Sequence, residues 1–283
     1  MKKIYKNIIL VAIFLGAVAA SLVALQSNVK QPTTKVAKII PKPTAVLTPT
    51  PTPLQNITLP MVMYHYVENV VNPVDTIRIK LDTNPALFNS QLMMLKDNNY
   101  ETYFVKDLPK ILDGKITPAS NSIILTFDDG YEDFYTDAFP ILKKYKYKST
   151  IYIVSKFINK KGYMTQKELQ EIQDSGIVEI GAHTLSHPDL RYLSLNKAQD
   201  EIVSSKVELE KMFSINVETF AYPGGGYNDN VIDIVKKAGY TVAVTTKPGI
   251  TIKRDSLLTV KRIRPGFLTI LQIKSFFKNF QFK

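Results

Sequence analysis

The chain has 283 residues, a length that suits one large domain or two small ones, and it contains no cysteine, which excludes disulfides, thiolate metal ligands, cysteine nucleophiles and a bacterial lipoprotein anchor. The formal net charge is +11, but residues 1–59 contain seven lysines and no acidic residue, which leaves 29 of the 36 basic residues against all 25 acidic residues in the remainder. That remainder shows no basic face with interleaved aromatic residues, so we expect no nucleic-acid partner.

The first 26 residues predict a membrane segment. Three lysines lie within residues 1–6, and residues 8–25 follow without any charge. A basic flank before eighteen mainly apolar residues is long for a signal-peptide core and just long enough to span a bilayer. We therefore expect an uncleaved N-terminal anchor with the rest of the chain outside the cell. A cleaved signal peptide is the alternative, because alanines within the segment offer cleavage sites.

Residues 27–58 predict a disordered linker. They are rich in Pro, Thr, Lys and Val and contain three consecutive Thr-Pro pairs. Such a segment buries too little apolar surface to fold, and its prolines keep it extended. We interpret it as a stalk between the membrane and a catalytic domain over residues 59–283.

Strands and helices alternate through this domain. Short apolar runs predict strands at 60–66, 122–127, 149–154, 178–182, 219–222, 241–245 and 257–263. Apolar residues at helical spacing predict helices at 85–99, 165–174, 196–213 and 230–238. This alternation is typical of an α/β fold with a parallel sheet, either open or closed as a barrel. In both cases the active site should lie at the carboxyl ends of the strands.

Two adjacent carboxylates, Asp128 and Asp129, follow the strand at 122–127 and precede Gly130. Keeping two acids close together is unfavourable, so the pair suggests a metal ligand, a general base, or one of each. A turn or a helix cap is the structural alternative, and for Asp-Asp-Gly alone it is the favoured one.

Two histidines four residues apart, His183 and His187, follow the strand at 178–182. Two of the three histidines of the chain lie here, and both imidazoles can face one point on a compact loop. With no thiolate available, Asp129, His183 and His187 are candidate ligands for a metal. Three protein ligands leave open positions for water, as in a catalytic site.

A third segment, residues 220–228, carries three glycines directly after a strand. Glycines allow backbone amides to approach a ligand closely. A flexible turn is the structural alternative, and the spacing fits neither nucleotide-binding motif.

Together, and in this order, these segments resemble the polysaccharide deacetylases of carbohydrate esterase family 4, which share the NodB homology domain. Residues 126–130 and 183–187 match the first and second motifs of that family. The resemblance implies a distorted (β/α) barrel, with Asp128 as general base. It also implies Asp129, His183 and His187 as ligands of a divalent metal, usually zinc.

The third motif of the family normally supplies an arginine that orients the base, and here residues 221–225 lack it. The later motifs normally supply an Asp-Trp pair and a histidine that acts as the general acid, but this chain has no tryptophan and no histidine after His187. Residues 240–246 and 260–263 occupy those places.

The same departures resemble a subgroup that includes the poly-N-acetylglucosamine deacetylases. In that subgroup a Phe-Ala-Tyr-Pro run replaces the arginine motif, and a Met-Tyr-His segment precedes the catalytic core, as residues 63–65 do here. His65 is then the remaining histidine for the general acid, with a structural role as the alternative. The resemblance also implies that the backbone N–H of Gly224 stabilises the oxyanion.

The resemblance implies a hydrolase that acts on carbon–nitrogen bonds other than peptide bonds and removes N-acetyl groups from an extracellular polysaccharide. Poly-N-acetylglucosamine and peptidoglycan are the expected substrates. Tyr131, Tyr222 and Tyr227 are candidates to stack on sugar rings, although tyrosines at strand ends often only pack. An O-acetyl esterase and a non-catalytic glycan-binding module of the same fold are the alternatives. We expect a monomer whose partners are the polysaccharide and the membrane.

Overall fold

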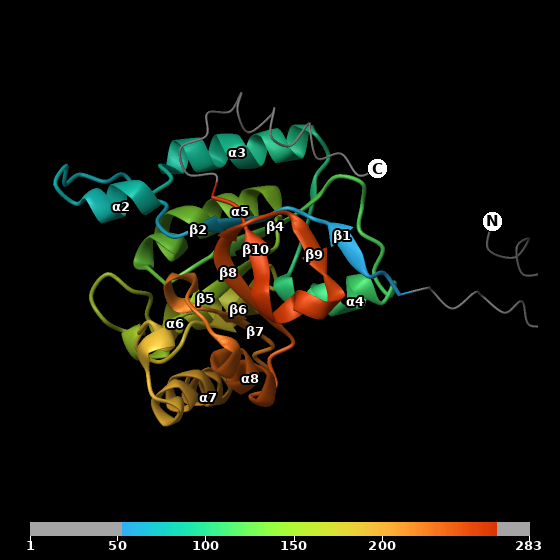
Figure 1. Cartoon of the computed structure of the whole chain (residues 1–283). Coiled ribbons are helices and arrows are strands. Elements are labelled where there is room, and N and C mark those ends of the chain that lie inside the picture. The colour runs from blue at the N-terminus through green and yellow to red at the C-terminus, as the bar shows by residue number, and fades with distance from the viewer. Residues whose placement is uncertain (1–52, 265–283) are drawn as a thin grey trace, which may run out of the picture. The chain divides into compact units, whose positions relative to one another are not determined.

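The computed structural model describes residues 53–264 (Figure 1). The predicted membrane segment and most of the predicted linker lie outside these residues. Within residues 53–264, no helix is both long enough and apolar enough to cross a membrane.

The core of the domain is a parallel sheet of eight strands. They are β2 (Met61–Tyr64), β3 (Glu101–Tyr103), β4 (Ser122–Phe127), β5 (Ser149–Ile153), β6 (Val178–Ala182), β7 (Thr219–Ala221), β8 (Val242–Pro248) and β10 (Val260–Arg262). The strand order is β10-β8-β7-β6-β5-β4-β2, and β3 pairs with the amino-terminal half of β4.

The sheet closes on itself where the chain leaves β10. The N–H of Ile263 donates to the carbonyl of Met61 at 2.8 Å, and the N–H of Met63 donates to the carbonyl of Ile263 at 2.8 Å. These bonds join the last strand to β2, the strand at the other end of the order. The predicted (β/α) barrel is confirmed.

Helices cover the outside of the barrel (Figure 1). The α-helices are α2 (Thr76–Leu81), α3 (Pro85–Asp97), α4 (Leu108–Leu112), α5 (Phe139–Tyr145), α6 (Gln166–Asp174), α7 (Leu195–Phe213) and α8 (Asp229–Lys237). Shorter helical segments are η1 (Val105–Asp107), η2 (Phe134–Ala138), η3 (Ser155–Phe157), η4 (Leu190–Tyr192), η5 (Pro223–Gly225) and η6 (Arg254–Thr259). The helix starts follow from local sequence: Thr165 and Glu168 form a reciprocal capping box at α6, and the Asn228 side chain caps α8.

Alternate residues of the strands face different apolar clusters. In β4, Ile123 and Leu125 pack in the cluster shared with the helices, whereas Ile124 packs in the cluster inside the barrel. Because side chains alternate along a strand, Thr126 and then Asp128 continue the inward series. The same alternation that builds the core therefore directs a carboxylate into the barrel.

The four predicted helices are confirmed to within two residues at each end. The predicted strand at 257–263 is wrong over its first half, because residues 254–259 form η6 and only Val260–Arg262 pair with β8. The sequence patterns also missed α2, α4, α5 and β3, which are short and carry few periodic apolar residues.

A small antiparallel sheet lies beside the barrel and includes part of the predicted linker. Strand β1 (Asn56–Thr58) pairs with β9 (Thr251–Lys253), and Ile57 packs in the interior cluster with an exposed fraction of 8%. The folded domain therefore begins before residue 59, the boundary that the sequence suggested.

Replacing Ile57 with Ala should lower the free energy of unfolding by about 2–4 kcal/mol, because it removes buried methyl groups from a closed cluster. Urea unfolding would measure the change. Asn56→Ala on the exposed face of the same strand is the matched control, with an expected change within about 0.5 kcal/mol. Equal stability of the two variants would show that β1 adds nothing to the folded domain.

Candidate active site

The predicted site residues lie together at the carboxyl ends of neighbouring strands. His65 follows β2, Asp128 and Asp129 follow β4, and His183 follows β6. The parallel register pairs Tyr64 with Phe127, so His65 and Asp128 emerge side by side.

Asp129, His183 and His187 converge on one point. The Nε2 atoms of both histidines lie 3.3 Å from Oδ1 of Asp129, and one ligand atom from each residue falls within 4.8 Å of the others. Asp129 has φ +77° and His187 has φ +62°, so both take the left-handed backbone conformation that turns their side chains toward this point. Non-glycine residues rarely adopt this conformation, and its use at two candidate ligands is typical of a functional site.

The surroundings of these three residues fit a divalent metal. Oδ1 of Asp129 is buried and has no hydrogen-bond partner among the described residues. The carbonyl of Ala221 lies 2.7 Å from Nδ1 of His183 and fixes the ring so that Nε2 faces Asp129. Imidazole and carboxylate donors in this number suit zinc or a similar ion. When bound, such an ion supplies Lewis-acid polarisation of a carbonyl and acidifies a water molecule.

Burial and neighbouring charges shift the pKa values of Asp129, His183 and His187. Burial favours the neutral form of Asp129, but the adjacent His183 outweighs burial and holds the pKa of Asp129 below its ordinary value. Burial alone would lower the pKa of His183, whereas Asp129 and Asp128 raise it overall. Burial and the neighbouring His183 lower the pKa of His187.

Asp128 pairs with Arg262. The guanidinium donates Nη1 to Oδ1 and Nη2 to Oδ2, both at 2.7 Å, in a bidentate ion pair. Arg262 is 1% exposed, and it also donates to the hydroxyl of Thr126 and to the carbonyl of Thr245, each at 3.0 Å. Burial would raise the pKa of Asp128, but Arg262 outweighs burial and holds that pKa well below the usual range.

Sequence reasoning missed Arg262. Residues 221–225 lack the arginine that the family resemblance led us to expect next to Asp128, and the structure pairs Asp128 with Arg262 of β10 instead, 134 residues away. One signal could have found it: a buried carboxylate requires a counter-charge, and Arg262 is a cation at the end of the last predicted strand.

His65 lies beside the same carboxylate. Its side chain is 12% exposed, and its Nε2 is 3.9 Å from Oδ2 of Asp128, which is too long for a hydrogen bond. Burial lowers the pKa of His65 below its ordinary value, although Asp128 and Asp129 partly offset this effect. His65 is therefore largely neutral near pH 7, even though two carboxylates lie next to it.

Gly224 lies on the loop that follows β7 and has φ +58°. Its carbonyl accepts from the Thr246 hydroxyl at 3.2 Å, whereas its N–H has no partner among the residues that the structure describes. Gly224 is exposed, so this N–H remains available to a ligand.

The three candidate tyrosines differ in exposure. Tyr131 is half-buried and stacks on Tyr66 with ring centroids 3.9 Å apart. Tyr227 is also half-buried, and its hydroxyl accepts from Lys247 at 2.9 Å. Tyr222 has no exposed surface and donates its hydroxyl to the carbonyl of Leu258, so its position corresponds to the packing alternative and offers no face to a sugar.

A barrel with two histidines and two adjacent carboxylates at its strand ends, one carboxylate facing the histidines and the other paired with an arginine, is typical of hydrolases with a metal centre. A family model described as polysaccharide deacetylase matches residues 115–243. The Bacillus subtilis protein YxkH, which carries the name of a polysaccharide deacetylase, is 33% identical over 210 residues, which cover 74% of this chain and 72% of that protein. This chain belongs to the polysaccharide deacetylase family, whose members are hydrolases.

Two further relatives have more specific names. The poly-beta-1,6-N-acetyl-D-glucosamine N-deacetylase of Staphylococcus aureus (strain MSSA476) is 32% identical over 169 residues, which cover 54% of this chain and 57% of that protein. The solved structure of the deacetylase PplD of Streptococcus pyogenes in complex with acetate superposes with a TM-score of 0.68 and 34% identity, covering 75% of this chain and 93% of that one.

Replacing Arg262 with Gln should shift the acidic limb of the pH profile of kcat/KM upward by about one unit or more. The reason is that burial, no longer opposed by the guanidinium, raises the pKa of Asp128, the candidate base, and a base must be ionised to act. The free energy of unfolding should also fall by about 3 kcal/mol, because a buried carboxylate loses its partner.

Arg262→Lys keeps the charge and should restore part of the acidic limb. Arg254→Gln is the matched control: Arg254 pairs with the partly exposed Asp113 at 2.9 Å, away from the base, so the pH profile should not change. An acidic limb that stays in place in Arg262→Gln would contradict the assignment of Arg262 as the residue that keeps Asp128 ionised.

Proposed function

We propose that this protein is a metal-dependent deacetylase that hydrolyses N-acetyl groups of an extracellular N-acetylglucosamine polysaccharide. The observation that carries the proposal is a pair of adjacent carboxylates that have different partners. Asp128 is held ionised by Arg262, and Asp129 faces His183 and His187. Zinc is the proposed metal, since its usual donors are imidazole and carboxylate in a site without cysteine.

The roles of the residues follow from their positions. Asp128 accepts a proton from the attacking water as the oxygen of that water bonds to the acetyl carbon. The N–H of Gly224 donates to the oxyanion that forms on the carbonyl oxygen. The carbon–nitrogen bond then breaks, and the sugar amine leaves with a proton while acetate remains.

His65 is the proposed donor of that proton. Arg262 outweighs burial and holds the pKa of Asp128 well below its usual range, so Asp128 holds an accepted proton only weakly and can pass it to the neighbouring imidazole of His65. The gap of 3.9 Å between the two side chains needs a shift of about 1 Å to reach hydrogen-bond distance. A neutral His65 in the free enzyme is thus compatible with a later acid role.

The identity of the glycan rests on weaker support. The name of the Staphylococcus aureus relative favours poly-N-acetylglucosamine, and peptidoglycan is the second candidate. We place the protein at the outer face of the membrane, anchored by residues 1–26 or secreted after their cleavage. The half-buried Tyr131 and Tyr227 are the proposed sugar-contacting rings. A non-catalytic binding module is disfavoured, because the candidate base and all three candidate ligands are present and brought together.

The first test is release of acetate from N-acetylglucosamine oligomers and from peptidoglycan by zinc-loaded and metal-stripped protein, with product masses followed in parallel. We expect metal-dependent loss of about 42 Da per acetyl group from at least one glycan. Asp128→Asn should keep the bound metal, measured by elemental analysis, and lower kcat by about a hundredfold or more. Full activity in this variant would contradict the base assignment. Acetate release from O-acetylated xylan alone would identify an esterase instead.

His65→Gln should lower kcat by about a hundredfold on an N-acetyl substrate and much less on an activated aryl acetate ester, because an aryl alcohol leaves without needing a proton donor. The ratio of the two rates in the variant and in the wild type is the measurement. Equal losses on both substrates would assign His65 a structural role.

A further inference from the structure

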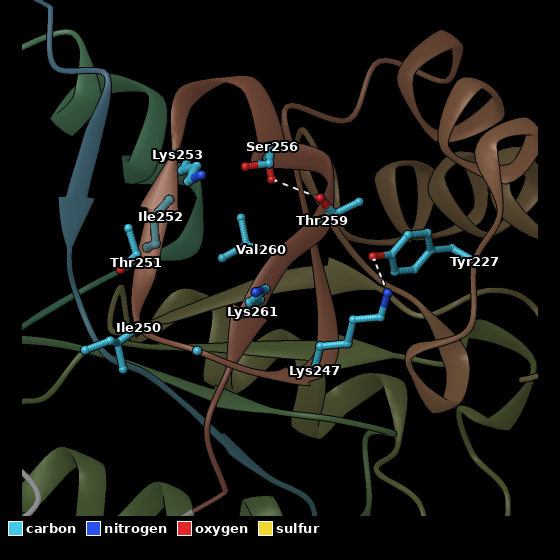
Figure 2. A pocket seen from close by; sticks show the side chains of 11 residues that line it. Tyr227, Lys247, Ile250, Thr251, Ile252, Lys253, Ser256, Thr259, Val260 and Lys261 are labelled. Carbon is cyan, nitrogen blue, oxygen red and sulfur yellow. Dashed lines mark hydrogen bonds between the residues drawn. The ribbon is translucent and has the colours of Figure 1, made fainter.

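A second concave site lies between β8, β9, β10 and η6 (Figure 2). It is a cavity of about 580 Å³. Residues from β9 and η6 form one part of its wall, and Tyr227 with Lys247 forms the opposite end, where a dashed line in Figure 2 marks the bond between them.

Three lysines and no acidic residue line this cavity. Lys247, Lys253 and Lys261 are all exposed, and none of them forms an ion pair with another described residue. Lys247 is held by a hydrogen bond to the hydroxyl of Tyr227, which carries no charge. Three positive charges around one cavity repel each other, so an anion that enters between them is stabilised by all three.

The remaining lining suits a sugar ring. Ile252 and Val260 border the cavity but are almost fully buried in the interior cluster, whereas Thr251, Ser256 and Thr259 are exposed or half-buried and offer hydroxyls at its wall. Such hydroxyls are among the polar groups that orient a ligand in saccharide and small-ligand sites.

The backbone at Gly249 makes room for one of the lysines. A Cβ atom at this position would lie 2.6 Å from Cδ and 3.0 Å from Cβ of Lys261. The aliphatic part of Lys261 therefore lies directly against Gly249, and a side chain at position 249 would displace it.

Two structural links connect the lining of the cavity with the candidate active site. The ring of Tyr227 packs against Tyr222 with centroids 5.0 Å apart, three residues after the Gly224 turn. Lys261 immediately precedes Arg262, so the two cations of β10 point to opposite faces of the same strand. A glycan whose sugar lies at Asp128 could extend over the Gly224 loop toward the lysines.

We propose that this cavity, lined by Lys247, Lys253 and Lys261, binds an anionic group on the glycan, a carboxylate or a phosphate, beyond the sugar that is deacetylated. This inference rests on the proposed function and specifies its substrate as an anionic glycan. Deacetylation turns N-acetylglucosamine into a cationic amine, so poly-N-acetylglucosamine becomes a polycation that a cluster of lysines repels. The charge of this cavity therefore favours the second candidate, peptidoglycan, which keeps its negative charges, over the glycan that the name of the Staphylococcus aureus relative favours.

The test compares three oligomers of equal length with the full-length protein in detergent. They are a neutral N-acetylglucosamine oligomer, the same oligomer bearing 6-phosphates, and an alternating oligomer with N-acetylmuramic acid, which carries carboxylates. Binding to metal-stripped protein is measured by calorimetry, and KM and kcat are measured on the zinc-loaded protein.

The variant is Lys253→Gln combined with Lys261→Gln, which leaves the Tyr227–Lys247 bond intact. It should raise the Kd and KM of at least one anionic oligomer by about tenfold at low salt and change those of the neutral oligomer by less than about twofold. The loss should shrink as salt is added. Whichever anionic oligomer shows the larger loss identifies carboxylate or phosphate as the bound group.

Lys197→Gln with Lys211→Gln is the matched control, since both lysines are exposed on α7 and distant in sequence from the cavity. The inference is overturned if the cavity variant binds both anionic oligomers as the wild type does, or if the control variant loses as much. If no oligomer releases acetate but anionic binding still depends on Lys253 and Lys261, the cavity assignment stands and the proposed function fails.

Discussion

The structure depends on the buried ion pair between Asp128 and Arg262. An isolated carboxylate in the barrel interior would take up a proton, because burial penalises its charge. Arg262 prevents this, but only because the barrel closes: β10 lies next to β2 through the hydrogen bonds of Ile263 with Met61 and Met63. The ion pair that keeps Asp128, the candidate base, ionised therefore exists only in the closed barrel, so the fold and the charge state of the site cannot be separated.

Asp128 and Asp129 are neighbours in sequence, and the backbone conformation at Asp129 gives their side chains different partners. Asp128 continues the inward series of β4 and meets Arg262, whereas Asp129, at φ +77°, turns to His183 and His187. Two adjacent acids on a regular strand would also diverge, but the left-handed turn brings the second one to the histidines without moving the first. Each carboxylate thus has its own partners, Arg262 for Asp128 and the two histidines for Asp129, which reduces the repulsion between the two acids.

Local sequence predicted those features whose causes are local. The strand before Asp128, the helix at 165–174 and the grouping of Asp129 with His183 all follow from patterns within a few residues or from the common edge of a parallel sheet. Arg262 does not, because its partner is 134 residues away and its strand has only three residues, too few to show a period. The pairing of β1 with β9 joins segments nearly 200 residues apart, which is why Ile57 was assigned to the linker.

The short strand β10 connects the two cationic sites of the domain. Arg262 points inward to Asp128, and Lys261 points outward to the cavity, so one three-residue strand fixes both positions relative to each other. Because side chains alternate between the two faces of a strand, a slip of β10 by one residue would place Lys261 at Asp128 and expose Arg262. Lysine cannot replace the bidentate bonds of the guanidinium, so the register of β10 is set by the base it holds. The geometry of the outer cavity follows from the same register, and a change that loosens the Asp128–Arg262 pair should also disturb the lysines on the other face.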